Sequence, residues 1–324
     1  MDPRAGRAVW ITWERHRRTR ELCRAFDIQL FELTARGPRL FRHPLLLLRT
    51  VVCLASTRPD TVFVQSPSIL LGLWGGILKR VFGYTYVADL HNEAVEPFNY
   101  SFAAYHMALA WIARLADLCL VTNDPLKSIV EGRGGRAFVL PDRVPAVVDG
   151  ETAATPHRRT PYVVFICSYA PDEPYLEVLS AASRLSDGMT VYITGNPQGV
   201  LRGVSIPANV SLTGYLPAAE YEALLRGADA VIDLTRMDNC LVCGAYEAVA
   251  VERPLVTSDT RALRTYFNRG TVYADHTPES LAAAIQQAVA QKTRLAEEMR
   301  LLKLELGERW NEGAEQLRRL LALS

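Results

Sequence analysis

DNCLVCGAYEAVAVERPLV, residues 238–256, follows a mostly apolar run at Ala230–Leu234 that predicts a buried strand. The quoted residues predict a loop and then a helix over Gly244–Val251, which ends at Arg253-Pro254 before another strand begins at Leu255. Backbone N–H groups at the start of such a helix favour an anion, and phosphate is the usual ligand. The stretch therefore predicts one strand–loop–helix unit of a doubly wound α/β fold.

Short apolar runs and helical segments alternate along the rest of the chain. In the first half we expect strands at Ala8–Trp13, Ile28–Leu33, Thr61–Gln65, Tyr84–Leu90, Leu118–Thr122 and Ala137–Leu140, and helices at Arg17–Ala25, Pro44–Ser56, Leu70–Phe82, Tyr105–Ala116 and Pro125–Glu131. In the second half we expect strands at Tyr162–Cys167, Thr190–Thr194, Asn209–Thr213, Ala230–Leu234, Leu255–Ser258 and Thr271–Tyr273, and helices at Leu176–Arg184, Ala218–Arg226, Gly244–Val251 and Pro278–Ala290. This strict alternation predicts two parallel, doubly wound sheets.

The chain length of 324 residues suggests about two domains. A polar segment, Val147–Arg159, interrupts the apolar pattern and predicts an interdomain linker. Lys292–Leu323 predicts a helical tail that contains the helix-breaking residues Gly307 and Gly313. We therefore expect an N-terminal domain over residues 1–150, a C-terminal domain over residues 160–300 and C-terminal helices over residues 301–324.

The net charge of +1 hides an asymmetry. Residues 1–60 carry 12 Lys and Arg against 6 Asp and Glu, whereas the remaining residues carry 24 against 29. A basic N-terminal region suits an anionic partner, and we favour a membrane surface or a lipid diphosphate; a solvated helix face would give the same excess. The segment Pro44–Ser56, with proline in its first turn, is apolar on nearly all sides. It predicts either a well-buried helix or a helix in the membrane interface.

Several patterns narrow the class of protein. The six cysteines lie mostly in apolar surroundings, which suits reduced thiols and a cytosolic compartment, and the lone Cys240-x-x-Cys243 pair argues against zinc. No G-x-G-x-x-G follows the first strand, so we expect no dinucleotide cofactor. The absence of Asp-x-Asp favours a metal-independent site. The first residues do not follow the signal-peptide pattern, and the most apolar runs, Leu45–Leu48 and Ile69–Leu78, fall short of the roughly 18 residues of a spanning helix.

The donor segment of GT-B glycosyltransferases of family four carries a Glu, then Gly-Phe-Gly, then a second Glu eight positions after the first, then Ala-x-Ala-x-Gly-x-Pro-Val. Residues 238–256 resemble this segment, with Glu247 at the second Glu position. The rest of the pattern is carried by Ala248, Ala250 and Pro254. Asn239 stands at the first position, and Glu252 replaces the usual Gly. Because the family's first Glu contacts the donor sugar, the resemblance leaves the identity of the sugar and the level of activity open.

A second resemblance is to the β-mannosyltransferases that extend chitobiosyl diphosphate on a lipid carrier. Those enzymes carry a Gln-Asn-Pro-Pro turn and an Asp-Trp-His-Asn turn; here the corresponding turns read Gln65-Ser66-Pro67-Ser68 and Asp89-Leu90-His91-Asn92, and CSYAPDEP follows at residues 167–174. Together the resemblances imply an α/β protein of the GT-B class. In this class two Rossmann-like doubly wound domains face an interdomain cleft, the second domain binds the donor, and the last helices cross back to the first domain.

The resemblances imply a donor site at strand ends of the second half. Glu247 suits hydrogen bonds from ribose or sugar hydroxyls. Family-four enzymes place an Arg and a Lys after the first strand of this domain, and neither is present at residues 167–174, although the lipid-linked mannosyltransferases also lack the pair. The expected donor-binding residues are Glu247, Asn239, Asp238, Cys240, Leu241, Val242, Ser168, Tyr169, Gly195, Asn196, Gly214, Tyr215 and Leu216.

The candidates for proton transfer lie in the first half, at the ends of two strands. Inverting GT-B enzymes often use a His or an acidic residue after the first strand as the base, and Glu14 and His16 stand there. In retaining family-four enzymes a His after the fourth strand approaches the donor sugar, and His91 matches that turn. The stereochemical outcome therefore stays open. The expected acceptor-side residues are Arg15, Asn92, Glu93 and Arg143.

These observations predict a glycosyltransferase that moves a hexose from a UDP- or GDP-sugar to a lipid-linked saccharide or polysaccharide precursor. We expect the nucleotide sugar to be a co-substrate, no further cofactor, no nucleic-acid partner, and a cytoplasmic location peripheral to the inner face of the membrane. Two alternatives remain. Asn239 and the missing Arg and Lys also suit a catalytically weak GT-B subunit that positions a partner enzyme, and a sugar-nucleotide epimerase has the same fold.

Overall fold

The computed structural model describes residues 7–66, 68–98, 103–146 and 161–323. The chain divides into two compact units. Unit 1 comprises Met1–Arg143 together with Arg309–Ser324, and unit 2 comprises Val144–Glu308. The predicted linker, Val147–Arg159, lies outside the described residues, as does Pro67 of the predicted turn after the third strand.

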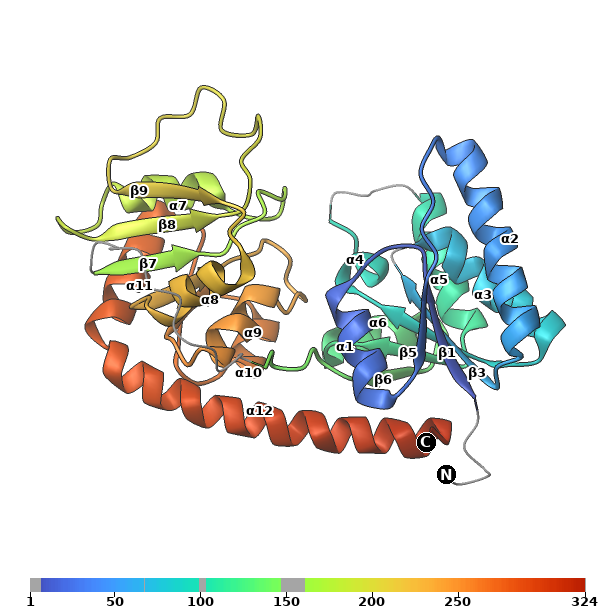
Figure 1. Ribbon diagram of the computed structural model, residues 1–324. Helices are drawn as coiled ribbons and strands as arrows, with labels where there is room; N and C mark the ends of the chain where they lie inside the picture. Colours follow the sequence, from blue (N-terminus) through green and yellow to red (C-terminus); the bar gives the residue numbers. More distant parts are fainter. Residues whose placement is uncertain (1–6, 67, 99–102, 147–160, 324) are drawn as a thin grey trace. The chain divides into compact units, whose positions relative to one another are not determined.

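Unit 1 is built on a six-stranded parallel sheet with the strand order β2-β1-β3-β4-β5-β6 (Figure 1). Its elements are β1 (Ala8–Thr12), α1 (Arg17–Phe26), β2 (Gln29–Glu32), α2 (Arg39–Thr57), β3 (Thr61–Ser66), α3 (Ile69–Phe82), β4 (Thr85–Leu90), α4 (Asn92–Val95), α5 (Ala103–Leu115), β5 (Leu118–Val121), α6 (Asp124–Gly132) and β6 (Ala137–Val139). The strand order reverses direction between β1 and β3, and open α/β sheets bind ligands beyond the carboxyl ends of strands at such a reversal.

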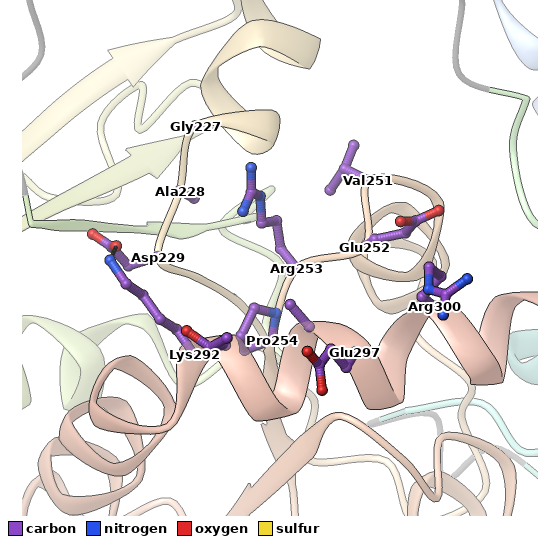
Figure 2. A pocket seen from close by; sticks show the side chains of 12 residues that line it. Gly227, Ala228, Asp229, Val251, Glu252, Arg253, Pro254, Lys292, Glu297 and Arg300 are labelled. Atoms are coloured by element: carbon purple, nitrogen blue, oxygen red, sulfur yellow. Dashed lines mark hydrogen bonds and ion pairs between the residues drawn. The ribbon is translucent and has the colours of Figure 1, made fainter.

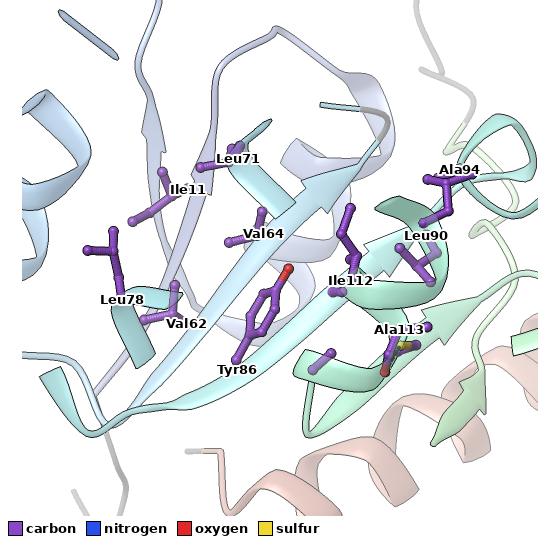
Figure 3. Close-up of a cluster of buried hydrophobic side chains, with 14 of the residues drawn as sticks. Ile11, Val62, Val64, Leu71, Leu78, Tyr86, Leu90, Ala94, Ile112 and Ala113 are labelled. Atoms are coloured by element: carbon purple, nitrogen blue, oxygen red, sulfur yellow. Dashed lines mark hydrogen bonds between the residues drawn. The ribbon is translucent and has the colours of Figure 1, made fainter. Parts of the chain in front are cut away.

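Successive strand residues of unit 1 face opposite sides of the sheet, so both faces need a cover. On one face, strand residues such as Ile11, Val62 and Val64 pack against α2, α3 and α5 (Figure 3). On the other face, Trp10 and Phe63 pack against α1 and against the end of α12 (Lys292–Leu321). The last turns of this helix therefore complete the core of unit 1.

Unit 2 repeats the design with the strand order β12-β11-β10-β7-β8-β9, all parallel. Its elements are β7 (Tyr162–Phe165), α7 (Tyr175–Ala182), β8 (Thr190–Thr194), β9 (Val210–Gly214), α8 (Ala218–Arg226), β10 (Ala230–Asp233), α9 (Cys243–Ala250), β11 (Leu255–Ser258), α10 (Arg261–Tyr266), β12 (Thr271–Ala274), α11 (Pro278–Ala290) and the first part of α12. Here the order reverses between β7 and β10. The two parallel-sheet, Rossmann-like domains confirm the predicted fold class.

The prediction for α2 was wrong at its start. The helix begins at Arg39, after Pro38, so Pro44 lies inside the helix and not in its first turn. Proline lacks the N–H that would bond the carbonyl four residues back, here that of Leu40, whose residue is 77% exposed and open to water. With its true start included, α2 is the described helix that is long and apolar enough to cross a membrane, over Leu40–Thr57.

Two short helices, α4 and α10, were not predicted, because segments of four and six residues are too short to show a helical spacing of apolar residues. The tail is one helix of 30 residues that runs through Gly307 and Gly313. Glycine costs roughly 1 kcal/mol inside a helix. Side chains buried along one side of α12 offset this cost; they are Leu295, Met299, Leu302, Leu306, Trp310, Ala314 and Leu317.

Candidate active site

The carboxyl edge of the unit 1 sheet brings two of the predicted catalytic residues together. His16 follows β1 and His91 follows β4, and their ring centroids lie 4.4 Å apart in an edge-to-face arrangement. Between them β3 ends at Gln65 and Ser66, and Thr12 Oγ1 donates a 3.0 Å hydrogen bond to Gln65 Oε1 that joins the ends of β1 and β3. The pair therefore lies where the strand order reverses.

A buried arginine that sequence reasoning missed lies beneath this pair. Arg18 is 4% exposed, and its Nε lies 3.2 Å from Asp89 Oδ1 at the end of β4. Its Nη1 donates to Asp142 Oδ1 at 2.5 Å, and its Nη2 donates to the Leu140 carbonyl at 2.8 Å. Asp89 Oδ2 in turn lies 3.5 Å from His91 Nε2. A signal existed, because Arg18 shares one helical face with Leu22 and Phe26, at spacings of four.

The surroundings set the charge of this cluster. Burial, with a contribution from the neighbouring His91, lowers the pKa of His16 to about 4. Burial alone would raise the pKa of Asp89, but the Arg18 guanidinium and His91 outweigh it and hold the pKa at about 2. At neutral pH a neutral imidazole of His16 thus lies near an ionised carboxylate. Among the described residues, the buried atoms His16 Nδ1 and His91 Nε2 have no hydrogen-bond partner of normal length.

The other residues predicted for unit 1 lie around this edge. Glu14 and Arg15 are exposed in the turn between β1 and α1. Asn92 Oδ1 accepts a 3.3 Å hydrogen bond from Thr122 Oγ1, and Glu93 Oε2 accepts one of 3.3 Å from the backbone N–H of Phe98. Arg143 stacks over the Trp310 ring at 5.0 Å from its centroid, within unit 1.

In unit 2, Glu247 lies one turn into α9, and its Oε2 accepts a 2.5 Å hydrogen bond from Tyr221 Oη. The start of α9 already holds a carboxylate. Asp233, from the end of β10, accepts a 3.0 Å hydrogen bond from the backbone N–H of Ala245. Gly244 leaves room for it, because a Cβ there would lie 2.6 Å from Asp233 Oδ2. Burial, together with Glu173 and Glu247, raises the pKa of Asp233 well above its usual value. The expected anion position at this helix start is thus taken by a side chain of the protein.

The loop after β7 also holds an internal carboxylate. Glu173 accepts hydrogen bonds from Ser168 N (2.9 Å), Ser168 Oγ (2.9 Å) and Ala170 N (2.9 Å). Tyr169 adopts a left-handed conformation at φ +61°, and its buried Oη has no hydrogen-bond partner within the part of the chain that the structure describes. Both hydrogen-bond donors of the predicted donor-binding residue Ser168 therefore point at Glu173.

The remaining predicted donor residues fall into two groups. Leu241 and Val242 are buried in the core of unit 2, whereas Asp238 is exposed and Asn239 and Cys240 are half-buried. Gly195 has a clear packing role, because a Cβ there would lie 2.0 Å from the Cys167 carbonyl oxygen and its φ is +79°. Gly214 also has a positive φ, of +67°, but open space around it. Beside these glycines, Tyr215 is exposed and Asn196 and Leu216 are half-buried.

A separate hollow of about 630 Å³ lies at the other end of the unit 2 sheet (Figure 2). Its walls come from the residues that precede β10 and β11 and from the start of α12. Figure 2 shows Arg253 in its middle, and Lys292 pairs with Asp229 at 2.6 Å on one side. The hollow contains none of the predicted site residues, and it lies at the amino ends of the strands, where open α/β sheets rarely bind substrates.

Comparison with known proteins places unit 2 in a family. Residues 160–291 match the model of the family described as glycosyl transferases group 1, so this part of the chain is a glycosyltransferase group 1 domain. No curated protein matches the chain. The specific resemblance to lipid-linked β-mannosyltransferases therefore stays a prediction.

Solved structures agree with the fold over nearly the whole chain. Anabaena HepE in complex with UDP-glucose superposes with a TM-score of 0.73 at 12% identity, covering 96% of this chain and 99% of that one. Sucrose-phosphate synthase from Thermosynechococcus elongatus gives a TM-score of 0.72 at 16% identity, with 90% and 82% covered. A putative UDP-N-acetylglucosamine 2-epimerase from Listeria monocytogenes gives 0.64 at 13% identity, with 91% of each chain covered.

Proposed function

We propose that this chain, whose residues 160–291 form a glycosyltransferase group 1 domain, transfers a hexose from a UDP- or GDP-sugar to a lipid-linked saccharide or polysaccharide precursor. The family match over unit 2 is the observation that carries the proposal. Unit 1 supports it with two histidines at the strand-order reversal of its own sheet. With the lipid-linked acceptor we propose a cytoplasmic location peripheral to the inner face of the membrane.

The donor is held in unit 2 in this proposal. Glu247 accepts hydrogen bonds from ribose or sugar hydroxyls, and Tyr221, which bonds the same carboxylate, fixes its orientation. UDP is the nucleotide we favour, because the similar HepE structure is a complex with UDP-glucose. We propose that no metal is needed, since the sequence contains no Asp-x-Asp to bridge a diphosphate through a divalent ion.

The acceptor hydroxyl loses its proton to a histidine of unit 1. His16 is neutral at physiological pH, so its imidazole can accept a proton. An imidazolium formed on His91 would be stabilised by the ionised Asp89. If the base removes the proton of the acceptor hydroxyl, the acceptor oxygen attacks the anomeric carbon opposite the departing nucleotide diphosphate, and the configuration is inverted. A His91 that only contacts the donor sugar is compatible with retention.

Calorimetric titration of the purified protein with UDP and with GDP tests the proposal. We expect one nucleotide to bind, and Glu247→Gln to weaken it about 10-fold or more, because hydrogen bonds to a charged group contribute about 1.5–3 kcal/mol. Glu279→Gln, a change of the same type at an exposed ion pair with Arg184, should leave the affinity unchanged. A panel of UDP- and GDP-sugars with mass detection then identifies the transferred sugar. If neither nucleotide binds, the proposal fails.

Two alternatives have their own observations. Asn239 at the donor-sugar position and Glu173 in the loop after β7 suit a subunit that binds nucleotide without turnover. The epimerase neighbour suits a reaction within the nucleotide sugar. Conversion of a nucleotide sugar in the absence of any acceptor would favour the epimerase, and nucleotide binding without turnover on any acceptor would favour the subunit.

A further inference from the structure

The helices on one face of the unit 1 sheet carry large apolar side chains on both of their sides. Toward the sheet, α2 contributes Leu46, Cys53 and Leu54 to the core. Away from it, a second stripe of α2 is exposed, and the same holds for α3 and α5. We call this second set the outer face; it consists of Phe41, Leu45, Leu48, Val52, Leu70, Ile77, Val81, Met107 and Trp111.

The spacing of the outer face is helical in each element. In α2 the exposed residues fall at 41, 45, 48 and 52, and in α3 they fall at 70, 77 and 81. Phe41 is 73% exposed, Val81 72% and Trp111 56%. Scattered exposed apolar residues are normal on a protein, but a stripe repeated on adjacent helices marks a surface that meets another apolar phase. All three helices belong to the layer that covers one face of the sheet.

The charges of these helices have one sign. The helices α2, α3 and α5 contain 19, 14 and 13 residues, and none is Asp or Glu, although 35 of the 324 residues of the chain are acidic. Their charged residues are Arg39, Arg42, Arg49, Lys79, Arg80 and Arg114. A shallow recess of about 300 Å³ between α3 and α5, lined by Leu73, Ile77 and Trp111, has Arg80 on its wall. Apolar stripes combined with basic side chains complement an anionic lipid surface.

The structure also indicates how α2 would meet the bilayer. Its inner stripe is part of the unit 1 core, and Thr50 in that stripe accepts a 3.0 Å hydrogen bond from Trp13 Nε1. A spanning orientation would pull these residues out of the core. We infer that the outer face is a docking surface for an anionic membrane, on which α2, α3 and α5 lie in the interface and α2 does not span. This inference rests on the membrane contact in the proposed function and specifies its surface and its lipid chemistry.

Vesicle sedimentation tests the inference with the full chain. We expect binding to vesicles of phosphatidylcholine with about 30 mol % phosphatidylglycerol, and much weaker binding to phosphatidylcholine alone. The triple variant Phe41→Ser/Leu48→Ser/Val81→Ser should lower the partition coefficient at least about 30-fold, because each lost contact removes buried apolar area. The matched control, Leu301→Ser/Leu304→Ser, changes exposed leucines of α12 and should leave binding unchanged.

Fluorescence and charge variants add independent readouts. The other tryptophans of the protein are buried or half-buried. Lipids whose acyl chains are brominated near the headgroup should therefore quench chiefly the fluorescence of Trp111, and Trp111→Phe should remove that quenching. Arg42→Gln/Arg80→Gln should weaken binding to anionic vesicles about 10-fold or more, since each basic side chain near the surface contributes about 1 kcal/mol.

Three results would overturn the inference: no binding to anionic vesicles, unchanged vesicle binding of the triple variant, or a protein that is a dimer in solution and becomes a monomer in the triple variant. The last would assign the outer face to a second copy of the chain. Nucleotide titration of the same triple variant without lipid separates this inference from the proposed function. Nucleotide binding without vesicle binding defeats only the docking surface, and vesicle binding without nucleotide binding defeats only the proposed function.

Discussion

The carboxyl edges of the two sheets both contain buried carboxyl groups, but the groups that bond to them differ. In unit 1 the buried carboxylate of Asp89 is matched by the guanidinium of Arg18, and two histidines lie beside this ion pair. In unit 2, Asp233 and Glu173 accept hydrogen bonds from backbone N–H groups at the helix start and in the loop. The first edge is thus arranged around fixed charge and proton acceptors. The second edge uses internal carboxylates where an anionic ligand would otherwise bind, so a diphosphate there must compete with them or displace them.

The largest effect that we expect concerns the fixed charge of unit 1. Arg18→Met leaves Asp89 and Asp142 without their shared cation, and breaking a buried ion pair in this way costs about 3–5 kcal/mol. Urea unfolding at pH 7 measures the loss. Arg20→Met, which breaks an exposed pair with Glu32, should cost much less, because solvent screens an exposed ion pair. Equal losses of unfolding free energy in the two variants would show that the buried ion pairs of Arg18 stabilise the fold no more than an exposed pair.

Arg18→Met should also reverse the pH dependence of folding stability at low pH. Because the pKa of Asp89 is about 2 in the folded protein, below its usual value, its stabilising contribution is present above pH 4 and is lost as the pH falls toward 2. Without Arg18, burial would raise this pKa, so stability would instead fall as the pH rises. Addition of Asp89→Asn should then restore part of the stability of Arg18→Met.

The next largest effect concerns catalysis. If a unit 1 histidine is the base, its replacement by Gln should lower kcat about 100-fold or more while nucleotide affinity changes little. His16→Gln and His91→Gln made singly, with Glu14→Gln as the exposed comparison, rank the three candidates. A loss at His16 with an inverted product identifies an acceptor-side base, and a loss only at His91 with a retained product identifies a donor contact. Full activity in all three variants would remove the proposed role of this edge.

A third test concerns the close packing at the edge of unit 2. Gly195→Ala should destabilise the protein by about 2–3 kcal/mol, because its Cβ would overlap the Cys167 carbonyl oxygen and its φ is positive. Gly203 has the same φ of +79° with open space around it, so Gly203→Ala isolates the backbone contribution, expected at about 1 kcal/mol. Thermal or urea unfolding of the two variants compares them, and similar losses would mean that the close approach to Cys167 is unimportant.

A smaller effect of pH on folding stability involves one buried histidine in each unit. Burial lowers the pKa of His16 to about 4, so between about pH 4 and 6.5 the unfolded chain binds a proton that the native protein does not. Stability should therefore rise with pH across this range and level off above it. His16→Gln should flatten the rise, as should His276→Gln in unit 2 to a lesser extent, because burial also lowers the pKa of that histidine. A slope that neither variant changes would contradict this assignment.

The smallest effect concerns the buried hydroxyl of Tyr169. Its Oη has no partner among the described residues, so Tyr169→Phe should be neutral or stabilising by up to about 1 kcal/mol in the free protein. If the hydroxyl meets the nucleotide, the same change should weaken UDP binding several-fold. Calorimetry and unfolding on one preparation measure both, and a marked loss of stability would show that the hydroxyl already has a partner.

The sequence predicted those features that depend on strand ends. The positions of His16 and His91 followed from the turns after two apolar runs, and parallel strands necessarily bring such turns to one edge. The role of Arg18 did not follow, because its spacing of four from Leu22 and Phe26 indicates a shared helix face but does not show that Asp89 lies opposite it. The role of Glu173 did not follow, because it depends on how a turn folds back, which leaves no periodic pattern. The start of α2 was misjudged because Pro44 suits a first turn. Whether the predicted donor residues bind a donor stays a prediction.

The last turns of α12 have a consequence for the order of synthesis. Trp310, Ala314 and Leu317 cover the face of the unit 1 sheet that contains Trp10 and Phe63, and Trp310 Nε1 bonds the Pro141 carbonyl at 3.2 Å. Residues 7–143 leave the ribosome before unit 2, and these three residues leave it after unit 2. The sheet of unit 1 must therefore wait, with one face covered only in part by α1, until all of unit 2 has been translated.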